Sequence, residues 1–281
     1  MGHKPFIIVT GAEGQLAQAL KNQKFDAEVL FLNKNEFDLT DFDQMNGVFN
    51  KHQPSLIINT AAYTKVDDAE TNQDTASTVN TTGVGYLAEL CIKHQSKLIH
   101  ISTDYVFDGK KQSPYNEEDT VNPVTVYGKT KLMGEKLILT SGLTAFAIIR
   151  TSWLYSQYGH NFYKTMLRLS ETKNELQVVD DQTGCPTNAN DLAEALVKII
   201  PQLNRENSGI YHFSNAGATT WFGFAQAIFK KHKIDIKLNP VTSEQFPTAA
   251  KRPRYSVLDH SKIKVAFGLQ IENWETTLNK L

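Results

Sequence analysis

The chain has 281 residues, of which 41% are hydrophobic and 21% are charged, values close to those of ordinary globular proteins. This composition excludes disordered, collagen-like and coiled-coil proteins, and the length favours one large α/β domain or a core domain with a smaller partner. Lysine and arginine total 29 and aspartate and glutamate total 30, which gives a net charge of −1. That balance argues against a protein that works mainly by binding nucleic acid phosphates.

Two further features bear on the compartment of the protein. Its two cysteines, Cys91 and Cys185, lie far apart, so we expect neither a zinc cluster nor the disulfide framework of a secreted protein. No apolar run approaches the roughly 18 residues that cross a membrane, and residues 1–5 lack the apolar core of a signal peptide. We therefore expect a cytoplasmic protein with neither membrane nor nucleic acid as partner.

The first 150 residues alternate between short apolar runs and segments with apolar residues three or four positions apart. In chain order these patterns predict strand 6–10, helix 15–21, strand 28–32, helix 41–49, strand 55–59, helix 74–94, strand 97–101, helix 124–139 and strand 146–150. This strict alternation with short connections predicts an α/β fold with a doubly wound parallel sheet. Right-handed crossovers then place the loops that follow the strands at one edge of the sheet.

The alternation loosens after residue 153. The pattern predicts helix 161–170, strand 176–179, helix 191–200, strand 209–213 and helix 222–231, followed by a polar tail to residue 281. We expect a sheet domain over residues 1–155, completed by about 186–215. A smaller, discontinuous lobe over 156–185 and 216–281 would then close over the carboxyl edge of the sheet.

A glycine-rich loop joins the first predicted strand to the first predicted helix. Gly11 allows a tight turn, Gly14 allows close approach of a pyrophosphate, and Ala17 lets the helix pack on the sheet. The spacing after an N-terminal strand predicts dinucleotide binding, with an ordinary strand-to-helix turn as the alternative.

The residues after the second strand bear on the choice of dinucleotide. No carboxylate directly follows the strand, where NAD-binding proteins hold the ribose 2′-hydroxyl; Asn33 and Lys34 stand there, and Lys34 suits a 2′-phosphate. Glu36, a little later, keeps NADH open, so the prediction is NADPH or NADH. We expect Asp38, followed by Leu39, either to line an adenine pocket or to cap a turn.

Tyr127 and Lys131 lie four residues apart and therefore on one face of a predicted helix. About one such pair is expected by chance, so its position carries the weight. The pair follows Ser102 and Thr103, at the strand edge where Gly11 would hold a cofactor. A phenol titrates near pH 10, and a neighbouring ammonium lowers that pKa, which would make proton transfer practicable near neutrality. A solvated Tyr–Lys face is the alternative.

At these residues the sequence resembles the extended short-chain dehydrogenase/reductase family, and more closely its nucleotide-sugar reductase branch. The resemblance covers nearly the whole chain and is most specific at 102–109. The other matching segments are 11–16, 59–67, 126–131, 150–155, 181–187 and 252–253.

The resemblance implies a Rossmann-like NAD(P)-binding domain and a role for each matching residue. It implies catalysis by Thr103, Tyr127 and Lys131, with Lys131 also on the cofactor ribose. The implied cofactor contacts are Gly14, Gln15 and Leu16 at the phosphates, Asp38 and Leu39 at the adenine, and Ala62, Tyr63 and Thr64 beside the dinucleotide. The implied substrate contacts are Asp104, Tyr105 and Trp153 at the sugar, and Asn161 and Arg252 at the nucleotide diphosphate.

The implied reaction is reduction of the C4 ketone of dTDP-4-dehydro-β-L-rhamnose, with hydride from NAD(P)H and a proton from Tyr127. The alternatives are another nucleotide-sugar 4-keto-reductase or epimerase of the family, a bare dinucleotide sensor, and a non-catalytic subunit resembling the methionine adenosyltransferase β subunit. We expect a monomer or homodimer.

One departure from the family concerns metal. Some members are described as dimers bridged by magnesium through glutamates, and the equivalent positions here carry Ala19 and Asn190. We therefore expect no metal. The acidic residues Asp67, Asp68 and Glu70 suit a solvated helix start better than a metal site.

Overall fold

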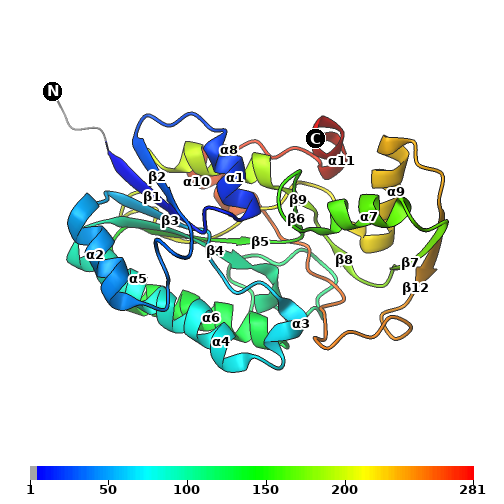
Figure 1. Ribbon diagram of the computed structural model, residues 1–281, viewed down its shortest axis with the longest axis horizontal. Helices are drawn as coiled ribbons and strands as arrows, with labels where there is room; N and C mark the ends of the chain where they lie inside the picture. The colour runs from blue at the N-terminus through cyan, green and yellow to red at the C-terminus, as the bar shows by residue number, and fades with distance from the viewer. Residues whose placement is uncertain (1–4) are drawn as a thin grey trace.

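The computed structural model describes residues 5–281, and the first four residues of the predicted sheet domain lie outside this range. A six-stranded parallel sheet forms the larger part of the molecule (Figure 1). Its strands are β1 (Phe6–Thr10), β2 (Glu28–Leu32), β3 (Leu56–Asn59), β4 (Lys97–Thr103), β5 (Phe146–Thr151) and β10 (Gly209–His212). They lie in the order β10-β5-β4-β3-β1-β2. The predicted doubly wound parallel sheet is confirmed.

Two layers of helices cover the sheet because alternate residues of each strand face opposite sides. On β1, Ile7 and Val9 share a core with one layer and Ile8 shares a core with the other. The first layer contains α1 (Gln15–Lys21), α8 (Ala189–Ile199) and α10 (Ser261–Phe267), and the second contains α2 (Phe42–His52), α5 (Gly83–Lys93) and α6 (Val126–Thr140). Strands buried on both faces read as continuous apolar runs, which is why the sequence predicted them.

The chain order creates a crevice at the carboxyl edge of the sheet. From β1 the chain passes to β2 on one side and then returns to β3 on the other. Ligands of such sheets bind where the winding changes direction, outside the carboxyl ends of the strands. Here that point lies between the loops after β1 and β3.

The predicted helix 74–94 is interrupted. The chain instead forms α3 (Val66–Ala69), α4 (Gln73–Ser77), a π-helical turn η1 (Thr78–Thr82) and then α5. In the turn, the Asn80 side chain pairs with both backbone groups of Tyr63, at 2.9 and 3.0 Å. A Cβ on Gly134 of α6 would lie 2.3 Å from the Asn80 carbonyl oxygen, so the two helices meet backbone to backbone.

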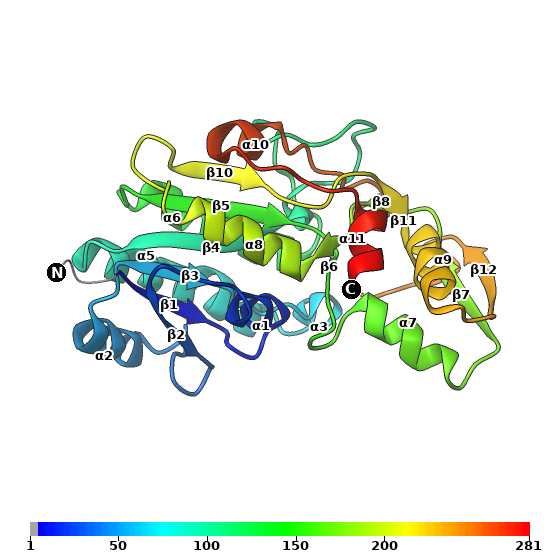
Figure 2. The same cartoon turned by 90° about the horizontal axis from the view of Figure 1, so that it is seen from above.

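A smaller lobe lies beyond the carboxyl ends of the strands (Figure 2). It has its own apolar core, and β7 and β12 form a parallel pair. Its elements are α7 (Phe162–Ser170), β7 (Glu175–Val179), α9 (Trp221–His232), β12 (Lys237–Val241) and α11 (Trp274–Lys280). The two-residue strands β6 (Leu154–Tyr155), β8 (Thr183–Gly184), β9 (Thr187–Asn188) and β11 (Thr219–Thr220) line the junction.

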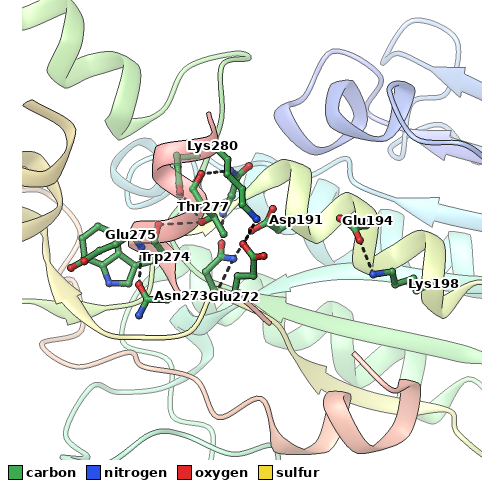
Figure 3. A network of polar contacts seen from close by, with 12 residues as sticks. Asp191, Glu194, Lys198, Glu272, Asn273, Trp274, Glu275, Thr277 and Lys280 are labelled. Atoms are coloured by element: carbon green, nitrogen blue, oxygen red, sulfur yellow. Dashed lines mark hydrogen bonds and ion pairs between the residues drawn. The ribbon is translucent and has the colours of Figure 1, made fainter. Parts of the chain in front are cut away.

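One segment differs from the expected boundaries. We expected residues 216–281 in the smaller lobe, but α10 packs on the sheet through Ile263 and Phe267. Figure 3 shows the polar contacts around α11, among them the pairing of Lys280 with Glu272 just before the helix. Asn188, the N-cap of α8, donates to the Thr277 carbonyl at 3.4 Å and so joins α11 to α8. No helix within residues 5–281 is long and apolar enough to cross a membrane.

Candidate functional site

The glycine-rich loop lies at the crevice between β1 and β3. Gly11 has a φ of +69°, and a Cβ there would lie 2.9 Å from the backbone nitrogen and Cα of Ala61 in the loop after β3. Gly14 donates its N–H to the Gly11 carbonyl at 2.8 Å and begins α1 without a side-chain cap. Only glycine fits at position 11, and neither glycine puts a side chain between the loop and a ligand. The loop therefore has the shape that a dinucleotide phosphate requires.

The next two residues of the loop turn their side chains away from the crevice. Gln15 is held by the chain before α7: its Oε1 accepts from Ser156 at 3.0 Å and from Asn161 at 2.8 Å. Leu16 is buried in the core beneath the sheet. Both side chains are thus engaged within the protein.

The residues after β2 form a tight polar turn. Asp38 accepts from both the N–H and the hydroxyl of Thr40, at 2.9 and 2.8 Å, so it caps a turn. Asn33 likewise accepts from the Asn35 N–H, and Leu39 is buried in the core. Lys34 is 77% exposed and lies 3.9 Å from Asp38, which leaves its ammonium accessible for an anionic group.

The residues after β3 border the crevice on the other side. Ala62 and Tyr63 are partly buried and Thr64 is exposed. Because Asn80 holds the backbone of Tyr63 from both sides, this loop is fixed against the π-helical turn.

The three predicted catalytic residues come together at the ends of β4 and α6. Thr103 is the last residue of β4, and α6 begins at Val126 with Thr125 as its N-cap. A Cβ on Gly128 would lie 2.2 Å from the Tyr105 carbonyl, so the first turn of α6 packs directly on the loop after β4. The Thr103 hydroxyl lies close enough to the Tyr127 phenol to lower its pKa, against the larger effect of burial.

The structure corrects one expectation about Tyr127. We expected Lys131 to lower the pKa of the phenol, but burial raises the pKa of Tyr127 to about 12. The Lys131 ammonium is directed elsewhere: it donates to the Ile101 carbonyl at 2.7 Å and contacts His100 Nε2 at 3.2 Å. The phenol is thus protonated at neutral pH and suited to give a proton rather than to take one.

Lys131 itself is 1% exposed. Burial lowers its pKa to about 8, against the opposing effect of the Glu135 carboxylate one turn further along α6. At pH 7 the ammonium form therefore outnumbers the amine by about ten to one.

Asp104 follows Thr103 and presents a free oxygen atom. Its Oδ1 accepts from the Thr103 hydroxyl at 3.1 Å, and Ser256 also bonds the carboxyl group. Its Oδ2 is buried and has no hydrogen-bond partner. Burial raises the pKa of Asp104 to about 6. A buried carboxylate oxygen without a partner is costly, and a ligand hydroxyl would satisfy it.

Two predicted substrate residues belong to aromatic contacts around this point. Tyr105 meets the Tyr127 ring edge to face, with centroids 5.6 Å apart. Trp153 has a φ of +46° and stacks on Trp221 of α9, with centroids 3.5 Å apart. Gly184 packs directly against this stack, since a Cβ at position 184 would lie 2.6 Å from the indole of Trp153. The aromatic pair therefore joins the sheet domain to the smaller lobe.

The two residues expected at the nucleotide diphosphate differ in their surroundings. Arg252 forms a two-point ion pair with Asp67, at 3.1 and 2.7 Å, and also bonds Tyr105. This pairing lowers the pKa of Asp67. The Asn161 amide nitrogen contacts Gln15, Ser156 and Tyr158, and its oxygen caps α7. The polar atoms of Asn161 are thus engaged within the protein, so its geometry does not support the expected diphosphate contact.

A cavity of about 1120 Å³ opens beside these residues in the smaller lobe. Its lining includes Trp221, which stacks on Trp153, and Arg252, which bonds Tyr105, together with Lys173, Arg254 and Phe246. Such a volume accommodates a ligand larger than a simple sugar. Its apolar walls and several cations suit a nucleotide with a diphosphate.

Sequence reasoning missed Trp221, Asp67 as a partner of Arg252, and Ser256. We interpreted Asp67 as part of a solvated helix start, because nothing in its local sequence indicates that it pairs with Arg252, 185 residues away. Trp221 begins α9 after its N-cap Thr220, and its stacking on Trp153 is a tertiary contact that the local sequence does not reveal. Within residues 5–281, no three His, Cys, Asp or Glu side chains are grouped to hold a metal ion.

Comparison with known proteins agrees over the full length. The family model described as the RmlD substrate binding domain matches residues 5–281. A dTDP-4-dehydrorhamnose reductase from Aggregatibacter actinomycetemcomitans is 43% identical, over 98% of this chain and 97% of the relative. The spore coat polysaccharide biosynthesis protein SpsK from Bacillus subtilis is 41% identical, over 98% of this chain and 95% of the relative.

A solved structure shares the fold as well. The dTDP-4-dehydrorhamnose reductase of Bacillus anthracis, in complex with NADP, is 38% identical and superimposes with a TM-score of 0.94. The match covers 99% of this chain and 98% of that chain.

Proposed function

Because this chain belongs to the RmlD substrate binding domain family, we propose that it reduces the C4 ketone of dTDP-4-dehydro-β-L-rhamnose with NADPH or NADH. Relatives named for this reductase activity match nearly the whole chain at 41–43% identity. The Bacillus anthracis structure in complex with NADP supports a nicotinamide dinucleotide as cofactor.

The observation that carries the proposal is the grouping at the ends of β4 and α6. The neighbouring hydroxyls of Thr103 and Tyr127 lie beside a carboxyl group with a free, buried oxygen on Asp104. This grouping adjoins Arg252, which lines a cavity of nucleotide size. A bare dinucleotide sensor has no use for these groups.

The chemistry follows from the state of each group. A nicotinamide bound between the loops after β1 and β3 would supply the hydride that adds to the carbonyl carbon of the sugar. The Thr103 hydroxyl polarises the carbonyl oxygen, and the Tyr127 phenol gives that oxygen its proton, so that a ketone becomes an alcohol. The phenol then regains a proton from water. Asp104 Oδ2 accepts a sugar hydroxyl, and the remaining N–H of Lys131, one turn along α6 from Tyr127, would bind the cofactor ribose.

The cofactor preference follows from the turn after β2. The exposed Lys34 ammonium, whose nearest carboxylate is 3.9 Å away, suits a 2′-phosphate. We therefore expect NADPH to be used at least as well as NADH, and Lys34→Ala to raise the KM for NADPH without changing that for NADH.

The test is turnover of the dTDP-linked 4-keto sugar, followed as loss of reduced-cofactor absorbance. Tyr127→Phe should lower kcat by about 10²- to 10⁴-fold, the usual contribution of general acid catalysis. Tyr86→Phe is a matched control, because Tyr86 packs on Phe42 away from the site. An epimerase would convert the sugar without net cofactor loss, and a regulatory subunit would convert nothing; either outcome, or a fully active Tyr127→Phe, refutes the proposal.

A further inference from the structure

A row of buried polar residues crosses the apolar centre of the sheet. Thr10, Asn59 and His100 occupy one register row on β1, β3 and β4. All three side chains are 0% exposed. Buried polar groups cost free energy unless they are hydrogen-bonded, so a polar row inside an apolar sheet requires a reason.

The row forms a continuous chain of hydrogen bonds that ends at the proposed catalytic lysine. The Thr10 hydroxyl donates to Asn59 Oδ1 at 2.7 Å, and Asn59 Nδ2 meets His100 Nδ1 at 3.0 Å. On the other side of the ring, His100 Nε2 lies 3.2 Å from Lys131 Nζ. The imidazole thus links β3 to α6.

Lys131 depends on this link because it is buried. An ammonium group has three N–H donors, and the Ile101 carbonyl accepts one of them at 2.7 Å. His100 is the second acceptor, which leaves one donor for the crevice. Without His100 a buried cation would hold a single neutral partner, and desolvation would shift it toward the amine.

The imidazole is suited to this task because it stays neutral. Burial and the adjacent Lys131 charge keep the pKa of His100 well below its usual range. An ammonium can only donate, so His100 Nε2 must accept while Nδ1 carries the ring proton. This tautomer requires the Asn59 carboxamide to be turned over relative to the contacts given above, so that its oxygen accepts from Nδ1–H and its nitrogen donates to Thr10 Oγ1.

The other charged groups near Lys131 do not replace this acceptor. On α6, the Glu135 carboxylate accepts hydrogen bonds from Arg150 at 2.7 Å and from Ser102 at 2.5 Å. On the loop after β4, Asp104 bonds Thr103 and Ser256. Both act on the lysine only through space.

We propose that His100 is a positioning residue for the reduction: its Nε2 accepts from Lys131 and holds that ammonium at the carboxyl edge of β4, oriented by Asn59 and Thr10. The inference rests on the proposed function, in which Lys131 acts beside Tyr127. Thr10 and Asn59 directly precede the two loops that border the crevice, and Thr10 Oγ1 also accepts from the Ala61 N–H at 3.4 Å. The row therefore fixes the lysine relative to the cofactor loops.

The test compares His100→Leu, His100→Gln and the control Ile99→Ala in rates of turnover from about pH 6 to about pH 10. Ile99 is the neighbouring residue of β4 and faces the opposite core, so its variant reports loss of sheet packing alone. In the unchanged protein kcat should fall near the Lys131 pKa of about 8. His100→Leu should move this alkaline limb at least about one pH unit lower, a tenfold loss of ammonium at a given pH.

Glutamine can place an acceptor near the position of Nε2, so in His100→Gln the pH at which kcat falls should return close to that of the unchanged protein. In Ile99→Ala this pH should not change. A limb that stays within about 0.3 pH units in His100→Leu, or moves equally in Ile99→Ala, overturns the inference. If His100→Leu does not fold, the test uses His100→Gln and Asn59→Ala. Asn59→Ala removes the group that orients the imidazole, so the pH at which kcat falls should move lower. An unchanged pH in Asn59→Ala would also overturn the inference.

A protein with no turnover at any pH would refute the proposed function instead. In that case the Lys131 pKa, followed by NMR of ¹³C-labelled lysine in the full chain, still tests His100. A lower value in His100→Leu than in the unchanged protein supports the inference, and equal values overturn it.

Discussion

Glu135→Gln tests the buried ion pair that supports the floor of the site. Glu135 is 0% exposed and accepts three hydrogen bonds from Arg150 and one from Ser102. Glutamine keeps the shape but removes the charge and turns an N–H₂ group toward other donors. Arg150 Nη1 already has no partner, so the variant leaves a poorly compensated buried cation.

The expected loss is about 3–5 kcal/mol, the usual cost of removing one partner of a buried pair. An unfolding entropy of about 2.1 cal/mol/K per residue gives roughly 0.6 kcal/mol/K for a chain of this length, so Tm should fall by about 5–8 °C. Thermal unfolding followed by circular dichroism, with urea unfolding at fixed temperature, measures both quantities.

The double variant Glu135→Gln/Arg150→Met is the control for charge. Removing both charges should restore at least half of the loss, because an apolar side chain replaces the unpaired cation. A loss below about 1 kcal/mol in Glu135→Gln, or a double variant as unstable as the sum of the two single variants, would contradict the reasoning.

Three further predictions follow from individual contacts. Gly11→Ala should lower the free energy of unfolding by about 1–2 kcal/mol, because the φ of residue 11 is +69° and an added Cβ would meet Ala61. The same variant should weaken NADPH binding at least tenfold, as measured by calorimetry. Gly47→Ala, with no neighbour within 4 Å of the added Cβ, should change neither quantity. Arg252→Lys, which loses the two-point pairing with Asp67, should raise the KM for the sugar nucleotide about tenfold and leave NADPH affinity unchanged; equal effects on both ligands would refute this. Burial lowers the pKa of His212 to about 3 and of His260 to about 4, so the unfolded chain binds protons first and stability should fall as pH drops from about 6.5 toward 4. Asp104, Glu117 and Asp191, whose pKa values burial raises, act in the opposite sense, whereas His100, whose pKa burial lowers, acts in the same sense as the two histidines. Equal urea midpoints at pH 7 and pH 5 would contradict the prediction.

The central sheet could be predicted because its strands are buried on both faces and its helices are amphipathic. The break at η1 could not, because it depends on Asn80 meeting Tyr63 and on the close approach of Gly134, both of which are tertiary contacts. Strand β12 was missed because it contains Pro240 and polar residues. Pro240 has no N–H to donate to a neighbouring strand, which is tolerated because β12 pairs along only one edge, with β7.

The candidate site divides in the same way. Residues that follow strands, such as Gly11, Thr103 and Asp104, could be placed from the order of elements, because parallel strands end at one edge. Lys131 could be placed on the face of Tyr127, but its partner His100 could not, since it read as one polar residue in an apolar strand. The available signal was that three adjacent strands each carry a polar residue in the same register row.

The most direct test of the proposed reduction is transfer of the hydride itself. NADPH deuterated at both positions of nicotinamide C4 would be incubated with the protein and dTDP-4-dehydro-β-L-rhamnose, and the product examined by NMR. The account predicts deuterium on C4 of the sugar, at a rate that collapses in Tyr127→Phe and persists in Tyr86→Phe. A reduced sugar without deuterium at C4, or no reduced sugar with either cofactor, would contradict it.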